Sequence, residues 1–175
     1  MKKTRKITSI LTLAVVFCLV LVSLAQAEEK AKSLTWVDHK PNPRFSIHDP
    51  GTPTEKTDDL VLDRKTGLIW ARNAHLAGKT LTWEDAINYC QDLALGNLKG
   101  WQLPTQEELS SLVDPLRSVP ALPSGHPFIN VKAIHYWSGT QHDSASAGTV
   151  CIGTSGILRD DLYLVRGAAL PVLGR

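Results

Sequence analysis

The sequence lacks a strong excess of charge of either sign. Its 175 residues include 19 Lys and Arg against 17 Asp and Glu, a formal net charge of +2. Four of the positive charges lie in residues 1–27, so the rest of the chain has 15 basic against 17 acidic residues. Proteins that bind nucleic acid usually display a strongly basic surface. The charge balance therefore gives no support to a nucleic-acid partner.

Motifs of the common catalytic and cofactor sites are also missing. The sequence has no Gly-x-Ser-x-Gly nucleophile elbow and no glycine-rich phosphate loop. It also lacks the Glu-Pro-Asn or Gln-Pro-Asp loop and the Trp-Asn-Asp strand, whose oxygens would hold calcium in a sugar-binding lectin. We therefore predict that the protein is not an enzyme and has no catalytic residues, no metal ion and no cofactor.

The first 27 residues have the three-part pattern of a secretory signal peptide. Basic residues at 2–6 precede an apolar run from Ile7 to Leu24, and Ala25-Gln26-Ala27 supplies small residues for cleavage before Glu28. We predict export to the periplasm or the extracellular space, with no membrane span after cleavage. The apolar run is also about long enough to cross a bilayer, so an uncleaved membrane anchor is the alternative.

Cysteine is scarce, with three residues in all, of which Cys90 and Cys151 lie beyond the signal peptide. In an oxidising compartment an even pair favours one disulfide. A bridge between Cys90 and Cys151 would close a loop of about 60 residues and would stabilise the fold by roughly 4 kcal/mol. Two buried thiols are the alternative.

The chain beyond the signal peptide has the length of one domain. Residues 28–42 are polar and show neither a helical nor a strand period, which is typical of a linker, so the predicted domain covers residues 43–175. Within it, two short apolar runs, Asp59–Asp63 and Leu68–Arg72, flank Gly67, which can adopt a positive φ at the end of a turn. This pattern predicts a β-hairpin.

Two capped helices are expected after the hairpin. Thr82 is a good N-cap, and the apolar residues of 83–94 follow helical spacing on one face. Thr105 begins the second helix with Glu108 three residues later, which makes a capping box. Pro115 ends that helix, because the residue before a proline avoids the α region.

A long irregular loop and three strands complete the predicted fold. Residues 115–135 contain four prolines and little periodicity, and long loops in compact domains often carry binding sites. The strand candidates are Tyr136–Gln141, Thr149–Gly153 and Leu162–Arg166. Together with the hairpin and the two helices, they indicate an α+β fold.

The order of these elements resembles that of a C-type-lectin-like domain. The motifs that carry the resemblance are Asp63-Arg64-Lys65-Thr66-Gly67-Leu68-Ile69-Trp70, Thr82 to Cys90, Gly100 to Leu109, Pro127-Phe128, Tyr136-Trp137-Ser138-Gly139-Thr140 and Val165-Arg166. Over about residues 43–168 the chain is similar to the Lcl C-terminal domain family. The resemblance implies a C-type-lectin-like domain, with two helices packed on small twisted antiparallel sheets and with long loops.

What the resemblance implies about function is a non-enzymatic binding or adhesion module that recognises a polysaccharide, another glycan or a cell-surface protein. Gln102 stands where the family usually has Arg, which removes a bidentate ionic contact, and Gly139 stands where it usually has Ser. No collagen-like repeat is present, so the stalk of the family's namesake does not carry over. The alternatives are a metal-dependent oxidase of the formylglycine-generating type and a structural periplasmic subunit.

We expect the ligand to lie between the 115–135 loop and the turns at 141–148 and 153–161. The candidate binding residues are Tyr136, Trp137, His142, Asp143, Arg159 and Asp160. Aromatic rings close to long loops can stack on sugar rings, although packing in the core is the alternative for both aromatic candidates.

Two further groups of polar residues have a structural interpretation. His126, His135 and His142 are of a residue type that binds transition metals, but their wide spacing favours loop histidines. Arg72 and Arg166 lie in predicted strands, and we expect each to pair with a buried carboxylate such as that of Asp63 or Asp114, because a buried charge needs a partner.

Overall fold

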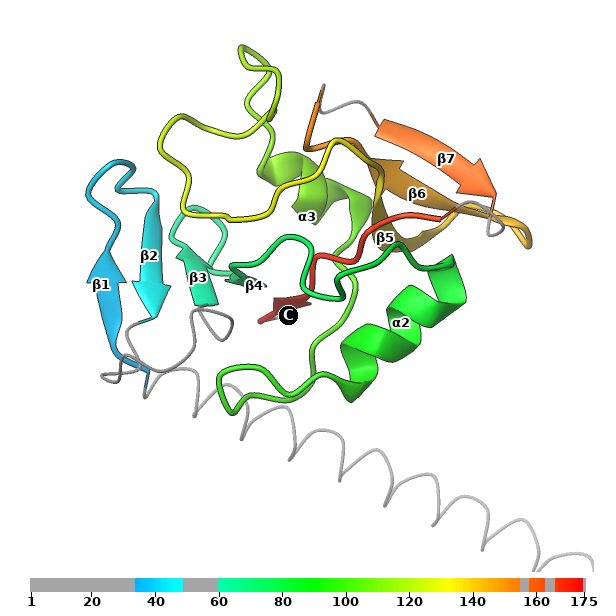
Figure 1. Ribbon diagram of the computed structural model, residues 1–175, viewed down its shortest axis with the longest axis horizontal. Helices are drawn as coiled ribbons and strands as arrows, with labels where there is room; N and C mark the ends of the chain where they lie inside the picture. The colour runs from blue at the N-terminus through cyan, green and yellow to red at the C-terminus, as the bar shows by residue number, and fades with distance from the viewer. Residues whose placement is uncertain (1–33, 49–59, 155–157, 163–165, 175) are drawn as a thin grey trace, which may run out of the picture. The chain divides into compact units, whose positions relative to one another are not determined.

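The computed structural model describes residues 34–48, 60–154, 158–162 and 166–174. Within these ranges the chain forms two helices and eight strands, which confirms the predicted α+β class (Figure 1). The chain divides into two compact units, Met1–Ser33 and Leu34–Arg175, and every described residue belongs to the second. The predicted signal peptide therefore lies outside the described residues. In the described part, no helix is both long enough and apolar enough to cross a membrane.

One sheet has five strands, and all of its neighbouring pairs are antiparallel. In the order in which they pair, the strands are β1 (Trp36–Asp38), β2 (Phe45–His48), β3 (Leu60–Asp63), β4 (Ile69–Ala71) and β8 (Val172–Leu173). β3 and β4 form the predicted hairpin, and Gly67 has a φ of +76° in the turn between them. The hairpin prediction is confirmed.

The edge strand β1 corrects the linker prediction for part of residues 28–42. Val37 pairs with Ile47 of β2, so this segment belongs to the sheet. Two of the three β1 residues are exposed, and no apolar alternation identifies the strand in the sequence. β8 joins the opposite edge through the pairing of Val172 with Trp70, about 100 residues apart in the chain.

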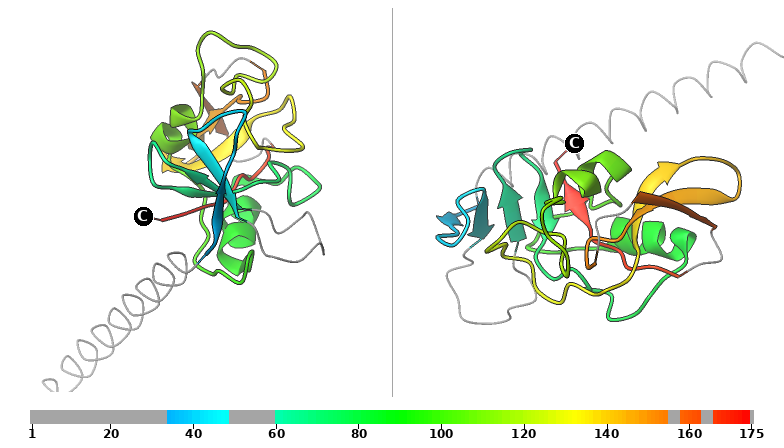
Figure 2. Two further views of the ribbon diagram at one scale, coloured as in Figure 1. Left: turned by 90° about the vertical axis from the view of Figure 1, so that its left-hand side faces the viewer. Right: turned by 90° about the horizontal axis from the view of Figure 1, so that it is seen from above.

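The second sheet has three antiparallel strands, β5 (Tyr136–Gln141), β6 (Ser146–Val150) and β7 (Leu158–Leu162). β5 agrees with the prediction, whereas β6 and β7 both begin earlier than predicted. The reason is a tight connection after β5, where the His142 amide donates to the Ser146 carbonyl at 3.1 Å and the next strand starts at once. Figures 1 and 2 place β1–β3 and β5–β7 at opposite ends of the described unit.

Both predicted helices are present, and both end earlier than predicted. They are α2 (Trp83–Asp92) and α3 (Gln106–Ser111). Thr82 Oγ1 accepts the amide of Asp85, and Thr105 and Glu108 form the complete capping box. Local side-chain chemistry therefore sets the starts of both helices, which is why they can be read from the sequence.

The core contains three tryptophans that are almost fully buried, Trp70, Trp101 and Trp137. One cluster joins α2 to β5 and β6. Its buried members are Leu81, Ala86, Cys90, Leu103, Trp137, Ala147 and Ala169. This cluster fixes α2 against the three-stranded sheet, while α3 packs on β5 and β6 as well.

The predicted disulfide is absent from the structure, in which Cys90 and Cys151 are separate buried thiols. Cys90 belongs to the cluster that contains Ala147 of β6, whereas Cys151 lies four residues further along, just past the end of that strand. The structure therefore agrees with the alternative prediction of two buried thiols.

Candidate functional site

The two aromatic binding candidates lie in the core. Tyr136 and Trp137 are both 0% exposed. The Tyr136 hydroxyl accepts the Lys132 amide at 2.8 Å, and Trp137 Nε1 donates to the Leu81 carbonyl at 3.0 Å. Because neither ring reaches the surface, their prediction as ligand contacts is corrected, and their polar atoms hold β5 to neighbouring loops.

The other candidates lie in or after the β5–β6 turn. His142 and Asp143 are exposed. The amide of Ala145 donates to Asp143 Oδ1 at 2.7 Å, and this hydrogen bond, with those from Ser146, lowers the pKa of Asp143. In β7, the backbone of Arg159 pairs with Thr149 and that of Asp160 with Gly148, and their side chains lie outside what the structure describes.

The histidines of the second half of the chain do not gather. Among the described residues, no group of three or more His, Cys, Asp or Glu side chains is placed to hold a metal ion. His126 stacks at a tilt beside Phe128, with ring centroids 6.1 Å apart. Burial, with the nearby charge of Arg117 and the ring of His39, lowers the pKa of His126.

The predicted long loop is irregular from Leu112 to His135, apart from a single bridge at Ile129. Its first half is held against the segment after β6, because the amides of Val119 and Ala121 donate to the carbonyls of Thr154 and Ile152 at 2.9 Å each. Leu116, between these anchors and α3, is 93% exposed, and the side chain of the anchored Val119 is 74% exposed. The loop is therefore fixed at its base and exposes two apolar side chains.

A buried ion pair, which the sequence does not identify, connects the first sheet to α3. Arg44 Nε and Nη2 donate to the two carboxylate oxygens of Asp63 at 2.8 and 2.6 Å, and the Asp63 side chain is 0% exposed. The same Nη2 donates to the Ser111 carbonyl at 2.8 Å. Asp63 thus pairs with Arg44 and not with Arg72 or Arg166, whose guanidinium groups donate to backbone carbonyls.

The pKa of Asp63 reflects these contacts. Burial alone would raise it, but the hydrogen bonds from Arg44, the Lys65 amide and the Thr66 hydroxyl outweigh burial and lower it below the ordinary value of 3.8. The carboxylate is therefore held in its charged form inside the sheet.

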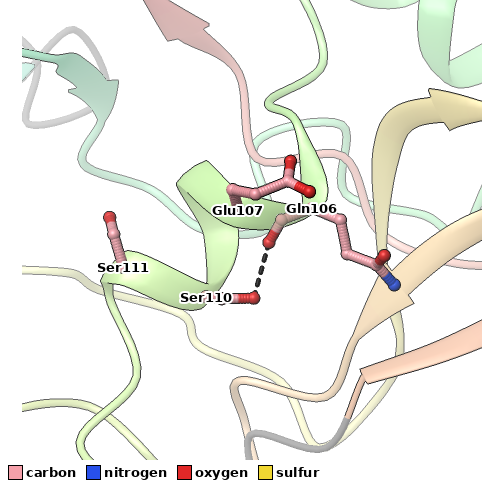
Figure 3. Close-up of a pocket in the computed structure, with 4 residues that line it drawn as sticks. All are labelled: Gln106, Glu107, Ser110 and Ser111. Atoms are coloured by element: carbon pink, nitrogen blue, oxygen red, sulfur yellow. Dashed lines mark hydrogen bonds between the residues drawn. The ribbon is translucent and has the colours of Figure 1, made fainter.

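An open hollow lies beside α3 (Figure 3). It has a volume of about 430 Å³, within the range of small-ligand sites, and it is open to solvent. Among the described residues, its lining side chains are those of Gln106, Glu107, Ser110 and Ser111. In Figure 3 the Gln106 side chain reaches from the helix towards the strands of the three-stranded sheet.

Tertiary contacts hold this hollow in place. The Gln106 amide donates to Thr140 Oγ1 at 3.0 Å, and the Gln106 side chain makes a long hydrogen bond of 3.5 Å to the Thr149 carbonyl. A Cβ at Gly148 would lie 2.8 Å from Gln106 Cδ, so the glycine makes room for this side chain. The other end of the hollow is fixed where Arg44 binds the Ser111 carbonyl.

None of the hollow's residues is among the sequence-predicted binding residues. The capping box predicts α3, and the spacing of 106, 107, 110 and 111 places all four on one side of a helix. That signal could have identified a polar face. It could not show that β6 lies close enough to that face to form a hollow.

Comparison with known proteins identifies one family. The family model of the Lcl C-terminal domain matches residues 59–160, which is 102 of the 175 residues. The match covers both helices, the irregular segment, β5 and β6. No curated protein matches the chain.

Proposed function

The chain belongs to the Lcl C-terminal domain family, and we propose that it is an exported, non-enzymatic binding or adhesion module. Its ligand would be a polysaccharide or a partner on a cell surface. The protein would act in the periplasm or outside the cell after removal of residues 1–27.

The observation that carries the proposal is the hollow beside α3 and the polar groups on its lining side chains. Its amide, carboxylate and hydroxyl groups come from one short helix that is fixed at both ends by hydrogen bonds. Small-ligand sites combine a concave surface with a few polar groups held in fixed positions. Hydroxyl-rich ligands such as sugars suit a site of this kind.

A C-type-lectin-like architecture is the finer fold assignment that we propose. Its support is the order of elements: a hairpin, two helices, the irregular segment at 112–135, and a small antiparallel sheet. In this assignment the irregular segment at 112–135 and α3 lie on the binding side of the domain, and Trp137 packs in the core.

The state of Cys90 favours binding over thiol-based oxidation. Burial raises the pKa of its thiol to about 12, and the thiolate is the reactive form of cysteine. A buried thiol that stays protonated is a poor candidate for the reactive cysteine of an oxidase of the formylglycine-generating type.

Glycan-array screening of the chain that begins at Glu28 tests the proposal, with Ser110→Arg as the site variant. The long Arg side chain would fill the hollow, so retained glycans should be lost. Asn88→Arg, on the exposed side of α2, is the matched control and should bind like the unchanged protein. If the unchanged protein retained no glycan and adhered to no cell surface, the proposed function would be wrong.

A further inference from the structure

The hydrogen-bonding groups of the hollow are strongly biased towards acceptors. Ser110 Oγ donates its proton to the Gln106 carbonyl at 2.6 Å (Figure 3). Ser111 Oγ donates to the Glu108 carbonyl at 2.7 Å. A serine hydroxyl has only one proton to donate, but two lone pairs that can accept. Both serines therefore present acceptor lone pairs to a ligand.

The other two side chains strengthen the bias. The exposed carboxylate of Glu107 can only accept hydrogen bonds. The Gln106 side-chain amide uses its nitrogen to donate to the Thr149 carbonyl. A ligand that brings hydrogen-bond donors and a positive charge would complement the Glu107 carboxylate and the serine oxygens.

Arg44, which donates a hydrogen bond to the Ser111 carbonyl, already has its charge balanced by Asp63. Arg44 contacts the backbone of Ser111, but its guanidinium group forms the ion pair with Asp63 from the side of the five-stranded sheet. Among the described residues that line the hollow, none is basic. Sulfate, phosphate and carboxylate groups offer only acceptors at neutral pH, so they would meet acceptors and a like charge in this hollow.

We propose that the hollow binds a polysaccharide with free amino groups, that is, with unacetylated amino-sugar residues. The ammonium group would lie against the Glu107 carboxylate, and neighbouring sugar hydroxyls would donate to the Ser110 and Ser111 oxygens. This inference rests on the proposed binding function and names its ligand class. A lysine side chain matches less well, because it brings one ammonium group and no neighbouring hydroxyl groups to donate to the Ser110 and Ser111 oxygens.

The test measures binding by calorimetry for the chain from Glu28, with oligomers of glucosamine, their N-acetylated counterparts and sulfated oligosaccharides of the same length. We expect the glucosamine oligomers to bind most tightly and to weaken as salt is added, because the ion pair is exposed to solvent. Glu107→Gln should weaken this binding about tenfold, which corresponds to the loss of a hydrogen bond between charged groups.

Glu84→Gln is the matched control, because Glu84 is the second residue of α2 as Glu107 is the second residue of α3, and both are exposed. Glu84→Gln removes one negative charge from the start of a helix, as Glu107→Gln does, and it should leave binding unchanged. If Glu107→Gln bound the glucosamine oligomers like Glu84→Gln, the assignment of this hollow would be wrong.

The remaining outcomes separate the two levels of the proposal. Preference for the sulfated oligosaccharides would overturn the amino-sugar inference and leave the binding function in place. Binding of a lysine-rich peptide that depends on Glu107, without binding of any oligosaccharide, would overturn it in favour of a protein partner. Absence of binding to every glycan and to cell surfaces would refute the proposed function itself.

Discussion

Two carboxylates in this domain have opposite environments. Asp63 in β3 accepts four hydrogen bonds, two from Arg44 and one each from the Lys65 amide and the Thr66 hydroxyl. Glu107 on α3 projects from an exposed helix face into a hollow whose serine oxygens have acceptor capacity left. The first carboxylate belongs to the interior of the fold, and the second is available to a ligand.

The comparison is sharpest when the Asp63 ion pair is removed. Asp63→Asn should destabilise the domain by about 3–5 kcal/mol, because it leaves the Arg44 charge, only 17% exposed, without a counterion. Chemical denaturation measures the loss. Asp38→Asn is the control in the same sheet, because Asp38 pairs with Arg64 at the surface and is 68% exposed. That change should cost less than about 1 kcal/mol, and similar losses for both variants would contradict the comparison.

The stability of the domain in acid should depend on the same carboxylate. Since the folded pKa of Asp63 is lowered, the stability it contributes is complete above the ordinary value of 3.8 and is lost as the pH falls below that value through the folded pKa. Denaturation midpoints measured across this range should fall steeply for the unchanged protein and less steeply for Asp63→Asn. Identical slopes would show that other groups control acid unfolding.

The hollow can be disturbed without touching its charge. Gly148→Ala places a methyl group 2.8 Å from Gln106 Cδ and 2.9 Å from Ser138 Oγ, so we expect a loss of about 1–3 kcal/mol from overpacking and weaker ligand binding. Gly139→Ala in β5 is the milder control, because its nearest contact would be the Leu103 carbonyl at 3.3 Å. Denaturation and calorimetry on both variants test whether Gln106 shapes the site.

A reducing agent should have the smallest effect of all. Cys90 and Cys151 are not bridged, so dithiothreitol should leave the unfolding midpoint of the chain from Glu28 unchanged, and thiol titration after unfolding should find both thiols. If a bridge formed during export, reduction would instead lower the stability of the domain by roughly 4 kcal/mol. No thiol would then be titratable before reduction.

Local chemistry explains what could be predicted from the sequence. Thr82, Thr105 and Gly67 set helix starts and a turn through neighbours only a few residues away, and all three predictions are confirmed. β8 depends on the pairing of Val172 with Trp70 across most of the domain, and β1 is a short exposed edge. Neither has a local pattern that would distinguish it.

The candidate site could be predicted only in part, for a similar reason. Side chains of adjacent strand residues point to opposite faces, so one of Tyr136 and Trp137 would be expected to face solvent on a half-exposed strand. In the structure both are buried, which shows that the first half of β5 is covered on both faces. The hollow depends on how closely α3 approaches β6, and no sequence spacing encodes that approach.

The contact between Arg44 and the last turn of α3 has a consequence for the kinetics of binding. The guanidinium group that is fixed on Asp63 also fixes the Ser111 carbonyl, while the capping box fixes the other end of the helix. A hollow held at both ends is formed before any ligand arrives, so little ordering entropy is lost on association. Observed association rates should then rise linearly with ligand concentration, without the plateau that a slow rearrangement of the site would produce.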